Sequence, residues 1–192
     1  MRWRIAVGVL FVGTVVLTSV LMKMNRDDRA ETGFAFPDLQ NAETVVLAGN
    51  EVTAEKRAAE VLSAWQPLDE KDLRQEHVRN SMKVDLVFPF FYALLIALVC
   101  WRASLNAPTR WVAVAGRIAA AAAVTGGIFD VLENLKMLSM LGDPKNAAGI
   151  ATVVLFRNLK VMGSMVGLVY ALLAHFALPV KTPASVSPIP SP

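Results

Sequence analysis

Three polar side chains follow one of the most apolar stretches of the chain, in the segment FDVLEN. Asp130, Glu133 and Asn134 have the spacing i, i+3 and i+4, which places them on one face of a helix. Two neighbouring carboxyl groups can act as general acid and general base, and with an amide oxygen they can bind a divalent cation. The segment therefore supplies candidate groups for catalysis, for cation binding or for buried hydrogen bonds.

Two other segments carry groups that could join this cluster. The segment DLVFPFFY places Asp85 and Tyr92 on one face of a second helix, and LFRNLKVMG places Arg157 and Lys160 three residues apart on a third. We expect the three helices to bring these groups to one depth, near the outer surface of a membrane. The candidate site is therefore a polar layer made of Asp85, Tyr92, Asp130, Glu133, Asn134, Arg157 and Lys160.

The helices that must position this layer are apolar enough to cross a membrane. Hydrophobic residues make up 55% of the 192 residues, and charged residues only 18%. The apolar residues fall into blocks of about 16 to 18 residues, or about 24 to 27 Å of helix, close to the thickness of a hydrocarbon core. The blocks are residues 5–22, 86–101, 112–129 and 161–178. We therefore predict an all-α membrane protein, a four-transmembrane-helix bundle with a small extracytoplasmic helical cap.

Basic residues in the short connections predict the orientation. If four spans alternate, one group of basic side chains falls on a single side of the membrane: Arg2, Arg4, Arg102, Arg110 and Lys181. We therefore expect a multi-pass protein of the cell membrane with both termini in the cytoplasm. The formal net charge of +3 mostly records this topology. We expect contacts with membrane lipids and with other membrane proteins, and none with nucleic acid.

The chain divides into four regions. Residues 1–22 form the first transmembrane helix, which reads as a signal anchor because no small-x-small cleavage site precedes Lys23. Residues 23–84 form an extracytoplasmic helical segment with a solvated stretch (RDDRAETG), an extended piece at Thr44–Leu47, a helix capped by Thr53, and a polar helix leading into the second span. Residues 85–178 form a three-helix transmembrane region. Residues 179–192, rich in Pro and Ser, form a disordered cytoplasmic tail.

Three interpretations of the polar layer remain open. In the first, its bonds only hold helices together, at about 1 kcal/mol each, in a non-enzymatic interaction or accessory membrane component. In the second, it binds a lipid headgroup or another small amphipathic molecule against the aromatic wall of FPFFY. In the third, Asp85, Asp130 and Glu133 serve a membrane enzyme. The sequence has no Ser-nucleophile, HExxH, CxxC or Gly-rich phosphate-loop motif, so we expect no cofactor and favour the first interpretation.

Small residues predict how the last two spans pack. Both carry small side chains four residues apart, a pattern that permits close approach of two backbones. One antiparallel register matches five pairs: Gly127 with Gly163, Ala123 with Gly167, Ala119 with Ala171, Asp130 with Lys160, and Glu133 with Arg157. The sequence therefore predicts a charged clasp at the outer end of a tightly packed helix pair.

The motifs D-x-x-F-P-x-x-Y (Asp85 to Tyr92) and D-x-x-E-N (Asp130 to Asn134) give the chain a resemblance to a known group. It resembles an uncharacterised family of small four-span bacterial membrane proteins, over roughly residues 43–172. The resemblance implies four spans and the outer polar layer. It implies no activity.

Overall fold

The computed structural model describes residues 2–42, 45–47, 50–68 and 73–177. Its long helices are α1 (Arg2–Thr32), α4 (Arg74–Asp85) continued by α5 (Phe88–Leu105), α6 (Arg110–Met140) and α7 (Ile150–Ala177). They provide four helical segments long and apolar enough to cross a membrane. The predicted all-α architecture with four such helices is confirmed.

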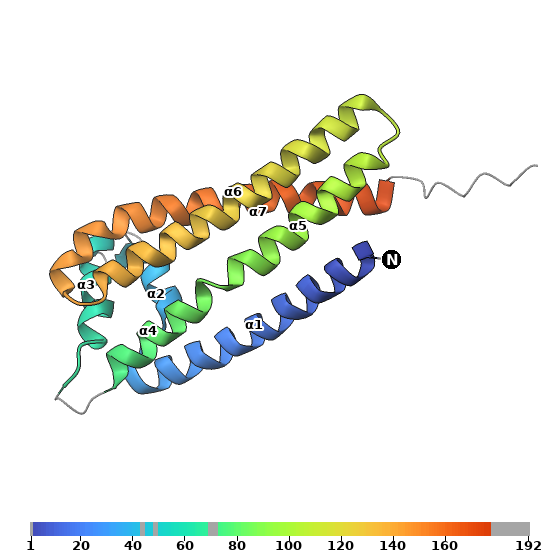
Figure 1. Ribbon diagram of the computed structural model, residues 1–192. Helices are drawn as coiled ribbons and strands as arrows, with labels where there is room; N and C mark the ends of the chain where they lie inside the picture. The colour runs from blue at the N-terminus through green and yellow to red at the C-terminus, as the bar shows by residue number, and fades with distance from the viewer. Residues whose placement is uncertain (1, 43–44, 48–49, 69–72, 178–192) are drawn as a thin grey trace, which may run out of the picture.

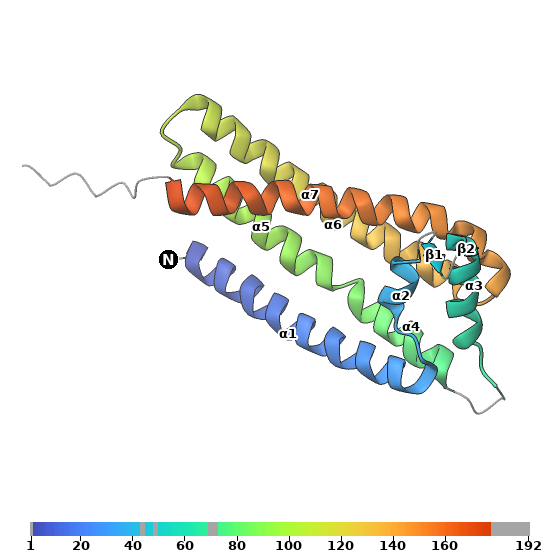
Figure 2. The same ribbon diagram turned by 180° about the vertical axis from the view of Figure 1, so that it is seen from behind.

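The long helices alternate in direction (Figure 1). Helices α6 and α7 pack against each other, α5 packs against both, and α1 lies on the opposite flank against α4 and α5. The start of α1, the turn between α5 and α6, and the end of α7 share one end of the bundle, and the short elements gather at the other, as the view from behind also shows (Figure 2). The start of α1 and the end of α7 therefore lie at the same end of the bundle, as expected for four alternating helical segments.

The helices are longer than the apolar blocks in the sequence. Helices α1 and α6 each have 31 residues. At about 1.5 Å per residue each spans about 46 Å, more than the roughly 30 Å of a hydrocarbon core. Their polar ends therefore extend beyond the apolar blocks, and at one end of the bundle they pack with the short elements.

The short elements are α2 (Phe36–Gln40), β1 (Val45–Leu47), β2 (Asn50–Val52), α3 (Ala54–Ala64) and the 3-10 helix η1 (Pro144–Gly149), and we call them the end cluster. Strands β1 and β2 pair antiparallel, with Val45 opposite Val52. The predicted extended piece is thus present at Val45–Leu47, while Thr44 lies outside the described residues. Thr53 caps α3 as expected, because its side chain accepts a hydrogen bond from the Lys56 N–H at 3.3 Å.

The end cluster shares one hydrophobic core with the ends of the long helices. Leu62 and Trp65 from the α3 region are fully buried, together with Met137 of α6 and Val153 of α7. Polar bonds add to this core, since Gln66 and Gln75 both donate to the carbonyl oxygen of Leu141, at 3.3 and 2.8 Å. The end cluster is therefore fixed to the bundle by both apolar packing and hydrogen bonds.

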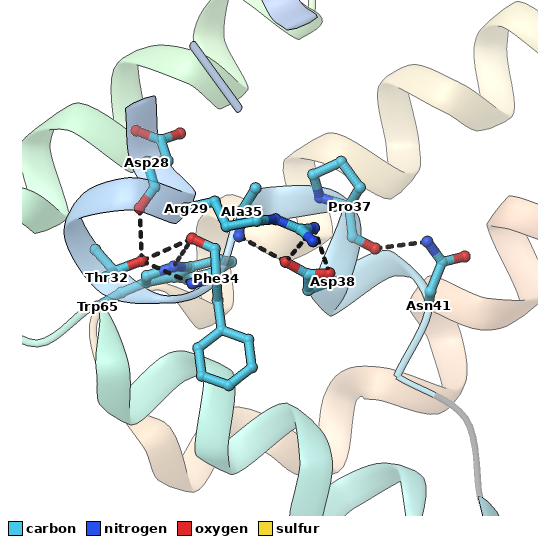
Figure 3. Close-up of polar contacts among 9 residues, drawn as sticks. All are labelled: Asp28, Arg29, Thr32, Phe34, Ala35, Pro37, Asp38, Asn41 and Trp65. Atoms are coloured by element: carbon cyan, nitrogen blue, oxygen red, sulfur yellow. Dashed lines mark hydrogen bonds and ion pairs between the residues drawn. The ribbon is translucent and has the colours of Figure 1, made fainter. Parts of the chain in front are cut away.

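The chain leaves α1 through a tight turn (Figure 3). Gly33 has a φ of +81°, the left-handed conformation in which helices often end. Asp38 then accepts from the Ala35 N–H at 2.6 Å and from the Arg29 guanidinium at 2.8 Å, which fixes the start of α2. The Trp65 indole N–H reaches the Phe34 carbonyl oxygen at 3.4 Å, so α3 is tied to the same turn.

The stretch RDDRAETG, residues 26–33, is mostly exposed, as the prediction of a solvated stretch requires, but it is helical and one of its side chains is buried. Helix α1 continues through it to Thr32, and Asp28 is only 4% exposed. Asp28 Oδ2 accepts a hydrogen bond of 2.7 Å from the Ser81 hydroxyl on α4. The burial of Asp28 was not predicted, and it follows because α4 packs against α1 and supplies the Ser81 donor.

A break separates α4 from α5. Leu86 and Val87 form a turn between the two helices, and Pro89 follows in the first turn of α5. Proline has no N–H, so the carbonyl of Asp85, four residues earlier, cannot receive the usual helical bond. The second span therefore bends next to a residue of the predicted polar layer.

Candidate functional site: a buried polar layer

Six of the seven predicted site residues come together between α4, α5, α6 and α7. From here on, the polar layer means Asp85, Tyr92, Asp130, Glu133, Asn134 and Lys160. The three residues of α6 lie on its buried face, as the i, i+3, i+4 spacing predicts. Glu133 and Asn134 are completely buried, and Asp130 is 4% exposed.

Lys160 of α7 is the cation of this layer. Its Nζ lies 3.0 Å from Asp130 Oδ1 and also pairs with Glu133 Oε2. The Tyr92 hydroxyl on α5 donates to the other oxygen of Asp130 at 2.8 Å. Asp130 therefore links α5, α6 and α7 through one carboxyl group.

Asp85 extends the layer to the end of α4. Its Oδ2 accepts a hydrogen bond of 2.7 Å from the Asn134 amide nitrogen. Asp85 as a whole is only 6% exposed. The Tyr92 ring packs beside Phe88, with ring centroids 5.1 Å apart. The bend between α4 and α5 thus directs two consecutive turns of the second span toward α6.

Arg157 does not join the layer, which corrects the predicted pair with Glu133. Its guanidinium donates to the Gln40 carbonyl oxygen and to Asn41 Oδ1, each at 3.0 Å. Arg157 lies about one helical turn before Lys160 on α7, on the side of the end cluster. The end cluster offers acceptors on that side, and Arg157 ties α7 to it instead.

The predicted register of α6 and α7 is right for two pairs and shifted for a third. Asp130 pairs with Lys160, and a Cβ on Gly167 would lie 2.9 Å from the Ala123 Cβ. Gly163, however, faces Gly126 rather than Gly127. A Cβ on Gly127 would instead lie 2.6 Å from the Ala93 Cβ of α5. The adjacent glycines of α6 therefore serve two different neighbouring helices.

The layer has more acceptors than donors. It contains three carboxyl groups and a single ammonium group, which cannot balance all three if each is ionised. Among the described residues, Glu133 Oε1 and Asn134 Oδ1 are buried without a hydrogen-bond partner. His77 does not supply a donor to the layer. Its Nδ1 lies 3.0 Å from Glu31 Oε2, in the contact between α1 and α4. Buried unpaired acceptors are uncommon and call for a donor.

An apolar groove of about 320 Å³ runs between α5 and α6 beside the layer. Small residues, Pro89, Ala93 and Gly127, line part of it, and larger apolar side chains complete it: Phe90, Leu94, Val124, Ile128, Val131 and Leu132. Neither Phe88, Tyr92 nor any acid of the layer lines this groove. Of the aromatic wall in the second interpretation, the groove thus contains Phe90 but does not lead to the acids.

The chemistry open to this layer is limited. In the parts of the chain that the structure describes, no group of three or more His, Cys, Asp and Glu side chains is arranged to hold a metal ion. None of the six residues of the layer carries a thiol, and Cys100 is buried elsewhere, with its Sγ 3.1 Å from the Gly167 carbonyl oxygen. The arrangement can join helices, and it can hold a proton or a small hydrogen-bond donor.

Sequence reasoning missed the buried pair of Asp28 and Ser81. A signal was present, because Leu17, Leu21 and Asp28 recur at helical spacing along one face of α1.

The chain matches no family model, no curated protein and no solved structure in three comparisons.

Proposed function

We propose that this protein is a non-enzymatic integral membrane component that acts by binding other membrane proteins, and that its polar layer is a structural clasp. The observation that carries the proposal is the enclosure of the layer. Glu133 and Asn134 have no exposed surface, and the acids face groups of neighbouring helices rather than an opening. A catalytic carboxyl group must contact its substrate, and these do not have access to one.

Helix α1 supports a role in binding a partner within the membrane. Among the long helices it packs mainly against α4 and α5, and only 6% of the residues in its apolar segment are buried. A contact near its middle is Gly13 against the Phe91 ring. Its remaining apolar faces, for example at Val12 and Val16, are exposed. A helix with so little internal packing is well suited to pack against a second membrane protein.

The proposed function is tested with Glu133→Gln, which removes the charge that faces Lys160. If the layer is only a clasp, the melting temperature in mild detergent and the yield of co-purifying membrane protein should fall together. The control is Glu60→Gln on the exposed side of α3, which should change neither. Loss of the partner with unchanged melting would contradict the clasp and favour a direct role of the acid.

A second candidate is a binder of a lipid or small amphipathic molecule. The apolar groove between α5 and α6 favours it, because its volume of about 320 Å³ and its apolar lining offer a contact surface to an acyl chain. Native mass spectrometry distinguishes the two candidates. A lipid that stays bound to the wild type and is lost from Val124→Trp, which fills the groove, would support the second candidate over the first.

We further propose that the end cluster is extracytoplasmic, that both termini are cytoplasmic, and that α1 is a signal anchor. Basic residues at the other end of the bundle support this orientation, including Arg4, Arg102 and Arg110. The resemblance to small four-span bacterial membrane proteins is consistent with it, since the motif residues Asp85 and Asp130 belong to the polar layer.

Cysteine labelling tests the orientation. In a Cys100→Ser background, a cysteine at Asn50 in the end cluster should react with an impermeant thiol reagent added to intact cells. A cysteine at Asn106, in the exposed turn between α5 and α6, should react only after the membrane is opened. Labelling of the Asn106 variant in intact cells would reverse the proposed orientation.

A further inference from the structure

We propose that the polar layer contains a proton-binding site in which Asp85 is a neutral carboxylic acid paired with the Asn134 side chain. A carboxylic acid and a carboxamide can join through two hydrogen bonds, with each group donating one and accepting one. One of the two bonds is present, from Asn134 Nδ2 to Asp85 Oδ2 at 2.7 Å. The second requires a proton on Asp85 and an acceptor on Asn134.

The acceptor for that proton is Asn134 Oδ1. This atom is buried and has no hydrogen-bond partner, although its residue is completely enclosed. A buried carbonyl oxygen without a partner has lost its hydrogen bonds to water and gained none in return, so a donor at this position is strongly favoured. A proton on Asp85 supplies the donor without any additional molecule.

The charges around Asp85 lead to the same assignment. Asp130 has both a cation and a hydroxyl donor, Lys160 and Tyr92. Glu133 shares the same Lys160. Asp85 has an amide as its hydrogen-bond donor, and it lies in a layer with two other acids, Asp130 and Glu133, that both contact Lys160.

Among the described residues of the other elements packed against α4, no further cation pairs with Asp85. On α1, Asp28 accepts from Ser81, and Glu31 pairs with His77, in both cases at earlier turns of α4. On α2, Asp38 is occupied by Arg29. Lys160 is the base that faces Asp85 from α7, and it is shared with two other acids. A buried carboxylate without its own cation is costly, and a bound proton removes that cost.

The site lies where its protonation would matter to the fold. Asp85 is the last residue of α4, directly before the turn at Leu86 and Val87 that separates α4 from α5. The two hydrogen bonds to Asn134 would hold this bend against α6. Loss of the proton would remove one bond and add a charge next to Asp130, so the bend should be the part of the protein that responds to pH.

Infrared spectroscopy and thermal melting test the site in the full-length protein in detergent. The wild type at neutral pH should show the C=O stretching band of a protonated carboxyl group, and Asp85→Asn should lose intensity in it. Because an amide at position 85 can form the same two bonds with Asn134, this variant should melt within about 3 °C of the wild type. Its melting temperature should also fall less steeply than that of the wild type as the pH is raised.

The matched control is Asp130→Asn, the same substitution on an ion-paired acid of the same layer. It should keep the band and lower the melting temperature by more than about 6 °C, because Lys160 loses a partner. Two results would overturn the proposal: an unchanged band in Asp85→Asn, or a loss of stability in Asp85→Asn as large as that in Asp130→Asn.

Discussion

Replacing Lys160 with Met is expected to lower the free energy of unfolding by about 3–5 kcal/mol, because it removes one partner of a buried ion cluster and leaves the others. The Lys160 side chain is 18% exposed, whereas those of Asp130 and Glu133 are 5% and 0% exposed. Both acids would then be buried without a cation or would have to take up protons. The change is measured by chemical or thermal unfolding in detergent, with helix content as the signal.

Lys83→Met on the exposed face of α4 is the matched control, and it should have little effect. A second comparison separates charge from packing. If uncompensated charge causes the loss, adding Asp130→Asn and Glu133→Gln to Lys160→Met should restore part of the stability. Equal stability of Lys160→Met and the wild type would show that the layer does not clasp the helices.

The composition of the polar layer could be predicted because it depends on local spacing and on depth. The i, i+3, i+4 pattern fixes Asp130, Glu133 and Asn134 on one face whatever the neighbouring helices do. The depth of these side chains in the membrane follows from the ends of the apolar blocks in the sequence. Asp85 and Lys160 each precede such a block, so both are placed at the same membrane depth. Opposite charge then pairs Lys160 with Asp130, and the structure confirms this pair.

The partners of Arg157 and Gly127 could not be predicted in the same way. A step of one residue turns the side-chain direction by about 100°, so Gly126 and Gly127 point to different helices. The choice between them depends on where α5 lies. Arg157 bonds to Gln40, which is 117 residues away in sequence, and no local pattern indicates that α2 lies beside this turn of α7.

Asp28 shows a different limit of sequence reasoning. A run of charged residues after an apolar block usually marks a solvated segment, and RDDRAETG has that composition. The helix nevertheless continues, because α4 packs along it and Ser81 gives the carboxyl group a donor. Composition alone does not reveal that partner, whereas the helical spacing from Leu21 to Asp28 is compatible with a buried face.

A close approach of α6 and α7 at Gly163 gives the second large effect. Gly163→Ala is expected to lower the free energy of unfolding by about 3 kcal/mol, at the upper end of the range for overpacking. A Cβ on Gly163 would lie 2.6 Å from the Ala122 carbonyl oxygen and 2.9 Å from the Gly126 backbone nitrogen. These are backbone atoms of a neighbouring helix, so relief requires the two helices to separate, which also draws Lys160 away from Asp130. Chemical unfolding in detergent measures the loss.

Gly8→Ala on α1 is the control, because nothing lies within 4 Å of the Cβ that it would add. Alanine has a higher intrinsic helix propensity than glycine by about 1 kcal/mol, so propensity alone would make both variants more stable. The two substitutions should therefore have opposite signs, with Gly8→Ala neutral or stabilising and Gly163→Ala destabilising. If Gly163→Ala were as stable as Gly8→Ala, α6 and α7 could not be in backbone contact at this position, and the clasp formed by Lys160 would need a different helix arrangement.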